Sequence, residues 1–204
     1  MKNYFILSIA TLALFAGACS KDRETTLQSY NKIIFEENFN TSTDNTNLNL
    51  AGWTNFAQIG SKKYTEQVYQ DNGYAEFTSF SSGDLVNIAW LVSPQIDMDL
   101  QEGEILSFQA AQSFLRSREN VLEVLVSTNF DGINVANADW TVVPAIVPTP
   151  DTRRFDFIFS RPIDLSSYTG KLNFAFRVKG SGTNSNLTGT YQIDDVMVYH
   201  KIQE

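Results

Sequence analysis

Apolar and polar side chains alternate along most of the chain after residue 32, in short stretches of about six to nine residues. Each stretch ends at Gly, Asn, Asp, Ser or Pro, the residues that favour turns. The alternation predicts β-strands over residues 33–39, 64–69, 74–80, 88–92, 105–111, 122–128, 140–143, 155–159, 172–179 and 191–199. This part of the sequence contains no convincing amphipathic helix, so we predict an all-β fold.

The stretch from Leu172 to Val178 indicates how such a strand packs. Every second residue is apolar, whereas Asn173 and Arg177 point to the other face. Because no helices are expected to cover a parallel sheet, the strands should pair antiparallel, and about ten short strands need two layers to bury their apolar faces. We therefore expect an antiparallel β-sandwich over residues 32–204.

Two adjacent carboxylates, Asp194 and Asp195, stand in the middle of the last predicted strand. Neighbouring side chains of a strand point to opposite faces, so one of the two acids is expected on the apolar face of the sheet. An ionised carboxylate there needs a cation or several donors, and Ca²⁺ with its oxygen ligands is the usual solution. The first strand carries a similar pair, Glu36 and Glu37. We expect these two strands to lie side by side, with their acids meeting at one calcium ion.

Residues 1–18 have the composition of a bacterial signal peptide. Lys2 supplies the positive start, and the apolar run over residues 4–15 is too short to cross a bilayer. Three small residues directly precede Cys19, which is the only cysteine of the chain. This ending resembles the lipobox of bacterial lipoproteins, in which the cysteine becomes the acylated first residue. The alternative is an ordinary secretory signal cleaved after Ala18, which would leave a free thiol.

With Cys19 lipidated, residues 19–31 would form a flexible polar tether between the membrane and the domain at 32–204. The charged tract at residues 20–24 resembles the surface-export signals of lipoproteins in some Gram-negative bacteria. We therefore expect a lipid-anchored protein of the outer membrane that faces the outside of the cell. Retention on the periplasmic side is the alternative.

Charge and histidine content limit the possible functions. The net charge of −8 and the pI near 4.6, without a cluster of Lys and Arg, argue against nucleic acid as a partner. The one histidine is His200, close to the end of the chain, so a Ser-His-Asp triad or a multi-histidine zinc site would depend on a terminal residue. We expect no enzymatic activity. A glycoside hydrolase, which needs only two carboxylates, is the least unfavourable enzymatic alternative.

Six motifs follow one another within residues 32–200. They are FEENF at 35–39, AGW at 51–53, WLVSPQID at 90–97, LEVLVST at 122–128, DLSSYTG with FAFR at 164–177, and IDDV at 193–196. Their order resembles that of the choice-of-anchor J and cleaved-adhesin domains, which are MAM-like modules of bacterial surface proteins. The resemblance implies a jelly-roll sandwich with a structural Ca²⁺ between the first and last strands, held by Glu37, Asp194 and Asp195.

Aromatic residues near predicted loops suggest where a ligand binds, since sugar rings stack on exposed aromatic faces. The segment 129–132 is predicted to be a loop tip, and we take Phe130, Asp131 and Trp140 as candidate ligand-binding residues. Relative to the similar domains, residues 113–120 form an insertion that could also bind a ligand. We expect a non-catalytic binding or adhesion module for carbohydrate or another extracellular ligand. The alternative is a structural partner subunit of an envelope complex, without a small-molecule site.

Overall fold

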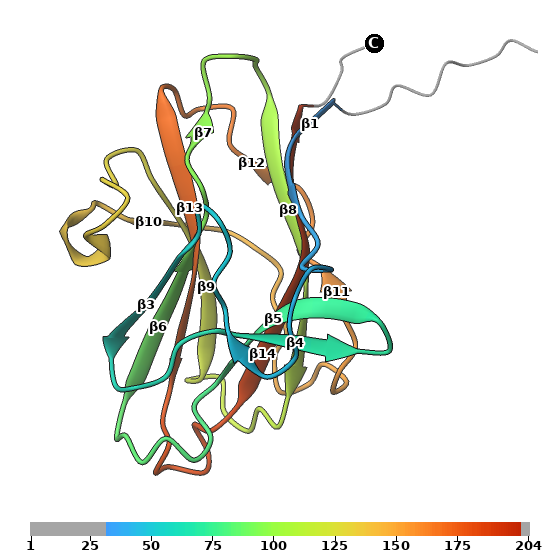
Figure 1. Cartoon of the computed structure of the whole chain (residues 1–204), viewed down its shortest axis with the longest axis vertical. Helices are drawn as coiled ribbons and strands as arrows, with labels where there is room; N and C mark the ends of the chain where they lie inside the picture. Colours follow the sequence, from blue (N-terminus) through green and yellow to red (C-terminus); the bar gives the residue numbers. More distant parts are fainter. Residues whose placement is uncertain (1–31, 201–204) are drawn as a thin grey trace, which may run out of the picture.

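Two antiparallel sheets face each other as a sandwich in a computed structural model that describes residues 32–200 (Figure 1). The first sheet consists of β1 (Lys32–Glu37), β2 (Thr46–Asn47), β4 (Thr65–Tyr69), β5 (Asn72–Thr78), β8 (Glu104–Ser113), β11 (Ile158–Phe159), β12 (Ile163–Asp164) and β14 (Thr190–His200). The second consists of β3 (Thr54–Ile59), β6 (Asn87–Val92), β7 (Ile96–Asp97), β9 (Val121–Ser127), β10 (Thr141–Val143) and β13 (Lys171–Gly180). The predicted all-β sandwich is confirmed.

The strand order brings distant parts of the sequence together. The first sheet runs β11-β8-β14-β5-β4-β2, with β1 beside β14 and β12 beside β8. The second runs β10-β9-β13-β6-β3, with β7 beside β13. The chain passes back and forth between the sheets, so sequential strands such as β13 and β14 lie in opposite layers. This crossing pattern is typical of a jelly roll.

The core lies between the two sheets and is built by the predicted alternation. In β13, Leu172, Phe174, Phe176 and Val178 are all fully buried. The ring of Phe176 packs edge to face on Phe108 of the other sheet, with ring centroids 4.9 Å apart. Burying each such side chain stabilises the fold by about 1.5–3 kcal/mol. The apolar alternation of the strands therefore supplies the main stabilisation.

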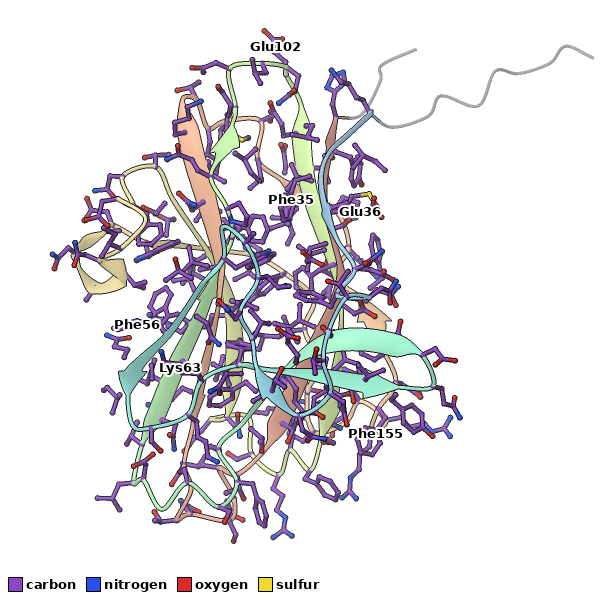
Figure 2. All side chains as sticks on the ribbon, viewed as in Figure 1. Phe35, Glu36, Phe56, Lys63, Glu102 and Phe155 are labelled. Carbon is purple, nitrogen blue, oxygen red and sulfur yellow. The ribbon has the colours of Figure 1, made fainter. Side chains whose placement is uncertain are left out.

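Four aromatic rings hold β1 against the second sheet. Trp53 lies within 6.0 Å of Phe35, Phe39 and Phe174, measured between ring centroids. Figure 2 shows Phe35 between the two sheets. Phe39 adopts a positive φ of 52°, which ends the first strand before it. The predicted extension of this strand to residue 39 is wrong for that reason, because β1 stops at Glu37.

A second apolar cluster covers the outer face of the six-stranded sheet. Trp90 and Val92 point away from the core, since they alternate with the core residue Leu91. The segment between β9 and β10, which contains the 3₁₀-helix η1 (Val135–Asn137), folds over them (Figure 1). This sheet is thus apolar on both faces, which the alternation alone did not predict.

Some predictions from the sequence concern residues outside the described part of the chain. The signal peptide at 1–18, Cys19 and the tether at 19–31 all precede residue 32, so their predictions stay predictions. Within residues 32–200, no helix is long and apolar enough to cross a membrane. The predicted strand at 155–159 is reduced to Ile158–Phe159, because Phe155 adopts a positive φ of 63°.

Candidate functional site

The first and last strands lie side by side, as predicted from their paired acids. β1 pairs antiparallel with β14, and Glu37 stands opposite Val196. The Oε1 atom of Glu37 accepts a hydrogen bond from the backbone N–H of Phe39 at 2.8 Å, whereas Glu36 is exposed (Figure 2). The charge of Glu37 also acts on the carboxyl of Asp194. Of the two first-strand acids, Glu37 is therefore the one that belongs with the acids of β14.

The two acids of β14 do not alternate across the sheet as expected. A β-bulge interrupts the pairing with β8, so that Asp195 and Val196 together stand opposite Phe108, and Asp195 has a φ of 47°. Ile193 and Val196 are both fully buried in the core, although they are three residues apart. The prediction that one acid lies on the apolar face is wrong, because the bulge takes up the extra residue and leaves both acids outside the core.

Asp194 is the buried member of the pair, with 5% of its surface exposed. Its oxygens accept hydrogen bonds from the side-chain amide of Asn72 at 2.8 Å and from the backbone N–H of Asp195 at 2.7 Å. Burial raises the pKa of Asp194, the two donors lower it, and the charges of Asp195 and Glu37 raise it further. Asp195 accepts a hydrogen bond from the side-chain amide of Gln109 at 2.7 Å. Among residues 32–200, none of these acids forms an ion pair with a cationic side chain.

The donor chemistry around these acids suits calcium, which prefers carboxylate and carbonyl oxygens. The loop after β1 lies so close to β5 that a Cβ atom on Gly73 would be 2.0 Å from the carbonyl oxygen of Phe39. However, across residues 32–200 no three Asp, Glu, His or Cys side chains are grouped so that they could hold a metal ion. A calcium site at Glu37, Asp194 and Asp195 therefore stays a prediction, and it requires these carboxylates to turn toward one another.

Phe130 and Trp140 were predicted to bind ligand, and both pack into the outer apolar cluster. Phe130 is only 6% exposed, and its ring centroid lies 5.7 Å from that of Trp140. Trp140 also packs on Trp90 at 5.3 Å and donates its indole N–H to the carbonyl of Val135 at 2.9 Å. These contacts account for both rings as packing residues, with little aromatic face left for stacking on a ligand.

Asp131, the third predicted ligand residue, shapes its own loop. Its Oδ1 accepts the backbone N–H groups of Ile133 at 2.8 Å and Asn134 at 2.7 Å. The hydrogen bonds from Asn134 are the largest cause of its lowered pKa. Beside this loop is a polar cavity of about 370 Å³, whose lining includes Thr54, Ser93, Gln95, Phe130, Asp131 and Asn173. A ligand role for Asp131 stays a prediction, although the loop does border a cavity.

A more aromatic cavity opens where β5 and β8 end and β14 begins. It has a volume of about 410 Å³ and is lined by Thr78, Phe80, Phe114, Arg116, Ser185, Thr188, Gly189 and Thr190. Phe80 is 70% exposed and Phe114 is 53% exposed. Phe155, which Figure 2 labels, is 57% exposed, and its ring meets that of Phe114 edge to face with centroids 6.3 Å apart. We call these three rings the aromatic cluster, and neighbouring exposed rings of this kind often mark a binding surface.

Two residues of the aromatic cluster, Phe114 and Phe155, have an unusual backbone conformation. Phe114 and Phe155 both have positive φ, at 59° and 63°, which costs free energy for residues with bulky side chains. The buried residue Gln112 holds both segments: its carbonyl accepts the N–H of Phe155 at 2.8 Å, and its Oε1 accepts the N–H of Leu115 at 3.2 Å. Phe114 and Phe155 are thus positioned by a buried anchor. The predicted insertion at 113–120 contributes Phe114 and Arg116 to this site.

An acidic cavity lies at the end of the sandwich where Figure 2 labels Glu102, away from Phe155. It has a volume of about 800 Å³, and Glu102, Glu104, Asp164 and His200 are among its lining residues. Glu104 is 1% exposed and its Oε1 accepts no hydrogen bond. The Nδ1 atom of His200 lies against the backbone carbonyl oxygen of Glu102. Within the described chain, His200 is hydrogen-bonded to no Ser, Thr, Asp or Glu side chain, so nothing there resembles a Ser-His-Asp triad.

No family model and no curated protein matches this sequence. Among solved structures, the K2 cleaved adhesin domain of Lys-gingipain (Kgp) has a TM-score of 0.53 and 17% sequence identity, covering 81% of this chain and 98% of that domain. The K1 cleaved adhesin domain of Lys-gingipain from Porphyromonas gingivalis has a TM-score of 0.48 and 18% identity, over 81% of this chain and 97% of that domain. The xylan-binding CBM22-2 domain of Xyn10C from Paenibacillus barcinonensis has a TM-score of 0.48 and 13% identity, over 82% of this chain and 99% of that domain.

The likeness to the K2 domain establishes the fold of this chain. The domain is a jelly-roll sandwich similar to the cleaved adhesin domains, as the motif order predicted. At this level of identity the likeness concerns the fold only, so the function has to be argued from the surfaces described above.

Proposed function

We propose that this protein is a lipid-anchored cell-surface protein whose jelly-roll domain binds carbohydrate without catalysing a reaction. The observation that carries the proposal is the aromatic cluster of Phe80, Phe114 and Phe155 beside a cavity of about 410 Å³. A flat ring that is half exposed can stack on the apolar face of a sugar while water still solvates the sugar hydroxyls. Thr78 and Thr188 line the same cavity. The Thr78 hydroxyl accepts the N–H of Phe80 and keeps its own O–H to donate, whereas the Thr188 hydroxyl donates to the carbonyl of Ser185 and keeps its lone pairs to accept.

The adhesin name of the similar K2 domain supports a role in binding rather than catalysis. The environment of His200 supports the same conclusion, since its ring contacts a backbone carbonyl at the far end of the domain. The acids of β1 and β14 have hydrogen-bond partners of their own and lie away from the aromatic cluster along β14. We therefore assign these acids to structure and not to hydrolysis.

A structural calcium ion is part of the proposal. Glu37, Asp194 and Asp195 would hold it, and the ion would offset two of their three negative charges while tying the first strand to the last. Such a tie suits a chain whose only cysteine, Cys19, cannot form an internal disulfide. Lipidation of Cys19 would anchor the chain to the outer membrane, with the polar residues 19–31 as a tether.

A glycan array tests the proposed function. The full chain, purified in a detergent without a sugar headgroup, should bind one group of glycans, and Phe114→Ala should weaken that binding about tenfold, which corresponds to ~1.4 kcal/mol. Phe159→Ala serves as the matched control, because Phe159 is similarly exposed, at 52%, on the separate strand β11. Absence of any glycan signal, together with co-purification of an envelope protein, would favour the alternative of a structural partner subunit.

A further inference from the structure

Arginine is concentrated next to the aromatic cluster, although the chain as a whole is acidic. The chain has 15 Lys and Arg residues against 23 Asp and Glu, for a net charge of −8. Four of its arginines nevertheless fall in two short segments, which are 116–118 and 153–154. An ion pair links Arg118 of the first segment to Asp151, which lies just before the second. Three acids, Glu119, Asp151 and Asp156, lie in or beside the same segments, so the surroundings of the cluster carry a small positive balance in an otherwise acidic chain.

Two of these four arginines are not neutralised by a carboxylate. Arg118 pairs with Asp151, and Arg153 lies 3.8 Å from Asp156. Arg116 lines the aromatic cavity, and Arg154 stacks over the ring of Phe114, with its Cζ 4.6 Å from the ring centroid. Within residues 32–200, neither Arg116 nor Arg154 forms an ion pair. Two guanidinium groups thus stay available beside exposed rings.

The guanidinium of Arg154 is placed where a ligand on Phe114 would meet it. Stacking on the ring face orients its planar N–H groups while leaving their edges free to donate. Gln112 holds the segment of Arg154 on both sides of that residue, because its carbonyl accepts the N–H of Phe155 and its side-chain amide donates to the carbonyl of Thr152. Since Gln112 is 2% exposed, this positioning is built into the fold.

We propose that the aromatic cluster binds an acidic glycan built of uronic acid units. In such a chain, each sugar presents an apolar face for a ring of the cluster and a carboxylate for the fork of an arginine. Arg116 and Arg154 would each bind a carboxylate through two N–H groups, a geometry that a neutral hydroxyl cannot match. This inference rests on the proposed carbohydrate function and narrows it to one class of glycan.

The test compares oligogalacturonides with their methyl esters, which have the same sugar backbone without the charge. Short oligomers are used so that calcium does not cross-link them. The full chain should bind the free acids at least about tenfold more tightly than the esters, and this preference should shrink as salt is added. Arg116→Gln and Arg154→Gln should each lower affinity for the acids about tenfold and lower affinity for the esters much less, so that the preference for the acids falls. Arg161→Gln, at an exposed arginine between β11 and β12, is the charge-matched control.

The remaining outcomes distinguish failure of the acidic-glycan inference from failure of the proposed carbohydrate function. The acidic-glycan inference would be overturned if the protein bound acids and esters with equal affinity. It would also be overturned if both arginine variants bound the acids as tightly as wild type does. Carbohydrate binding itself would stand in either case. Binding to sulfated chains such as heparin, without binding to uronic acid oligomers, would overturn the assignment to carboxylates. If no charged or neutral glycan binds while the protein remains folded, the proposed function itself fails.

Discussion

Replacing Asp194 with Asn separates the cost of a buried carboxylate from the benefit of an ion. Burial raises the pKa of Asp194, so the folded state holds its proton more strongly than the unfolded state does. The stability contributed by this group is therefore lost as the pH rises above the ordinary Asp value of about 3.9. Without calcium, Asp194→Asn should then unfold at the same or a higher temperature than wild type at neutral pH, and its stability should depend less on pH.

Calcium should reverse this order. At one hundred times its dissociation constant, an ion that binds only the folded state adds about 2.7 kcal/mol. For a domain of this size each kcal/mol corresponds to about 2–4 °C in Tm, so wild type should gain about 5–11 °C. Asp194→Asn should gain nothing, since it lacks a proposed ligand, whereas the control Asp139→Asn should respond like wild type.

Differential scanning fluorimetry in EGTA and in excess Ca²⁺ measures both effects on the same samples. A wild-type Tm that is indifferent to calcium would refute the ion. A full calcium response in Asp194→Asn would show that any bound ion lies elsewhere. If calcium has no effect, hydrogen bonds alone satisfy the three acids: Glu37 accepts from the N–H of Phe39, Asp194 from Asn72 and Asp195 from Gln109.

Three further predictions concern the anchor, the chemistry and the outer apolar cluster. Cys19→Ala should move the protein from the detergent phase to the aqueous phase in Triton X-114 partitioning and abolish fatty-acid labelling; unchanged partitioning contradicts lipidation. Glycoside, ester and peptide substrates should show no turnover above background, and reproducible hydrolysis lost on substituting a single acid would disprove this. Phe130→Ala should lower the free energy of unfolding by about 3–5 kcal/mol in urea titrations, because the ring is 6% exposed, and it should not alter glycan affinity; the opposite pattern would restore Phe130 as a ligand residue.

The long strands could be predicted because their side chains follow a simple rule. In β13 the apolar residues recur at every second position, and all of them are buried as expected. The two-residue strands β2, β7 and β12 have no such signal, since alternation needs more than two residues to be recognised. The bulge at Asp195 was missed because local sequence does not reveal how many residues of β14 face one residue of β8.

The proposed binding surface was harder to predict than the fold. Phe130 and Trp140 belong to the segment that covers the outer face of the six-stranded sheet, so they pack into the outer apolar cluster, and this depends on tertiary packing. Phe80 and Phe155 were included in predicted strands, so their exposure was not expected. A signal did exist at Phe114, which lies in the insertion at 113–120 together with arginine. Aromatic residues that fall where apolar alternation stops are therefore better candidates than those next to a regular strand.

Calorimetric titration of the best glycan from the array into the full chain tests the central claim most directly. Wild type and Phe159→Ala should bind with the same affinity within about twofold, whereas Phe80→Ala and Phe114→Ala should each bind about tenfold more weakly, at ~1.4 kcal/mol per variant. The melting temperatures of the three variants should equal that of wild type, because Phe80, Phe114 and Phe159 are each more than half exposed. Wild-type affinity in both Phe80→Ala and Phe114→Ala would contradict the account, since the glycan would then bind at a surface other than the aromatic cluster.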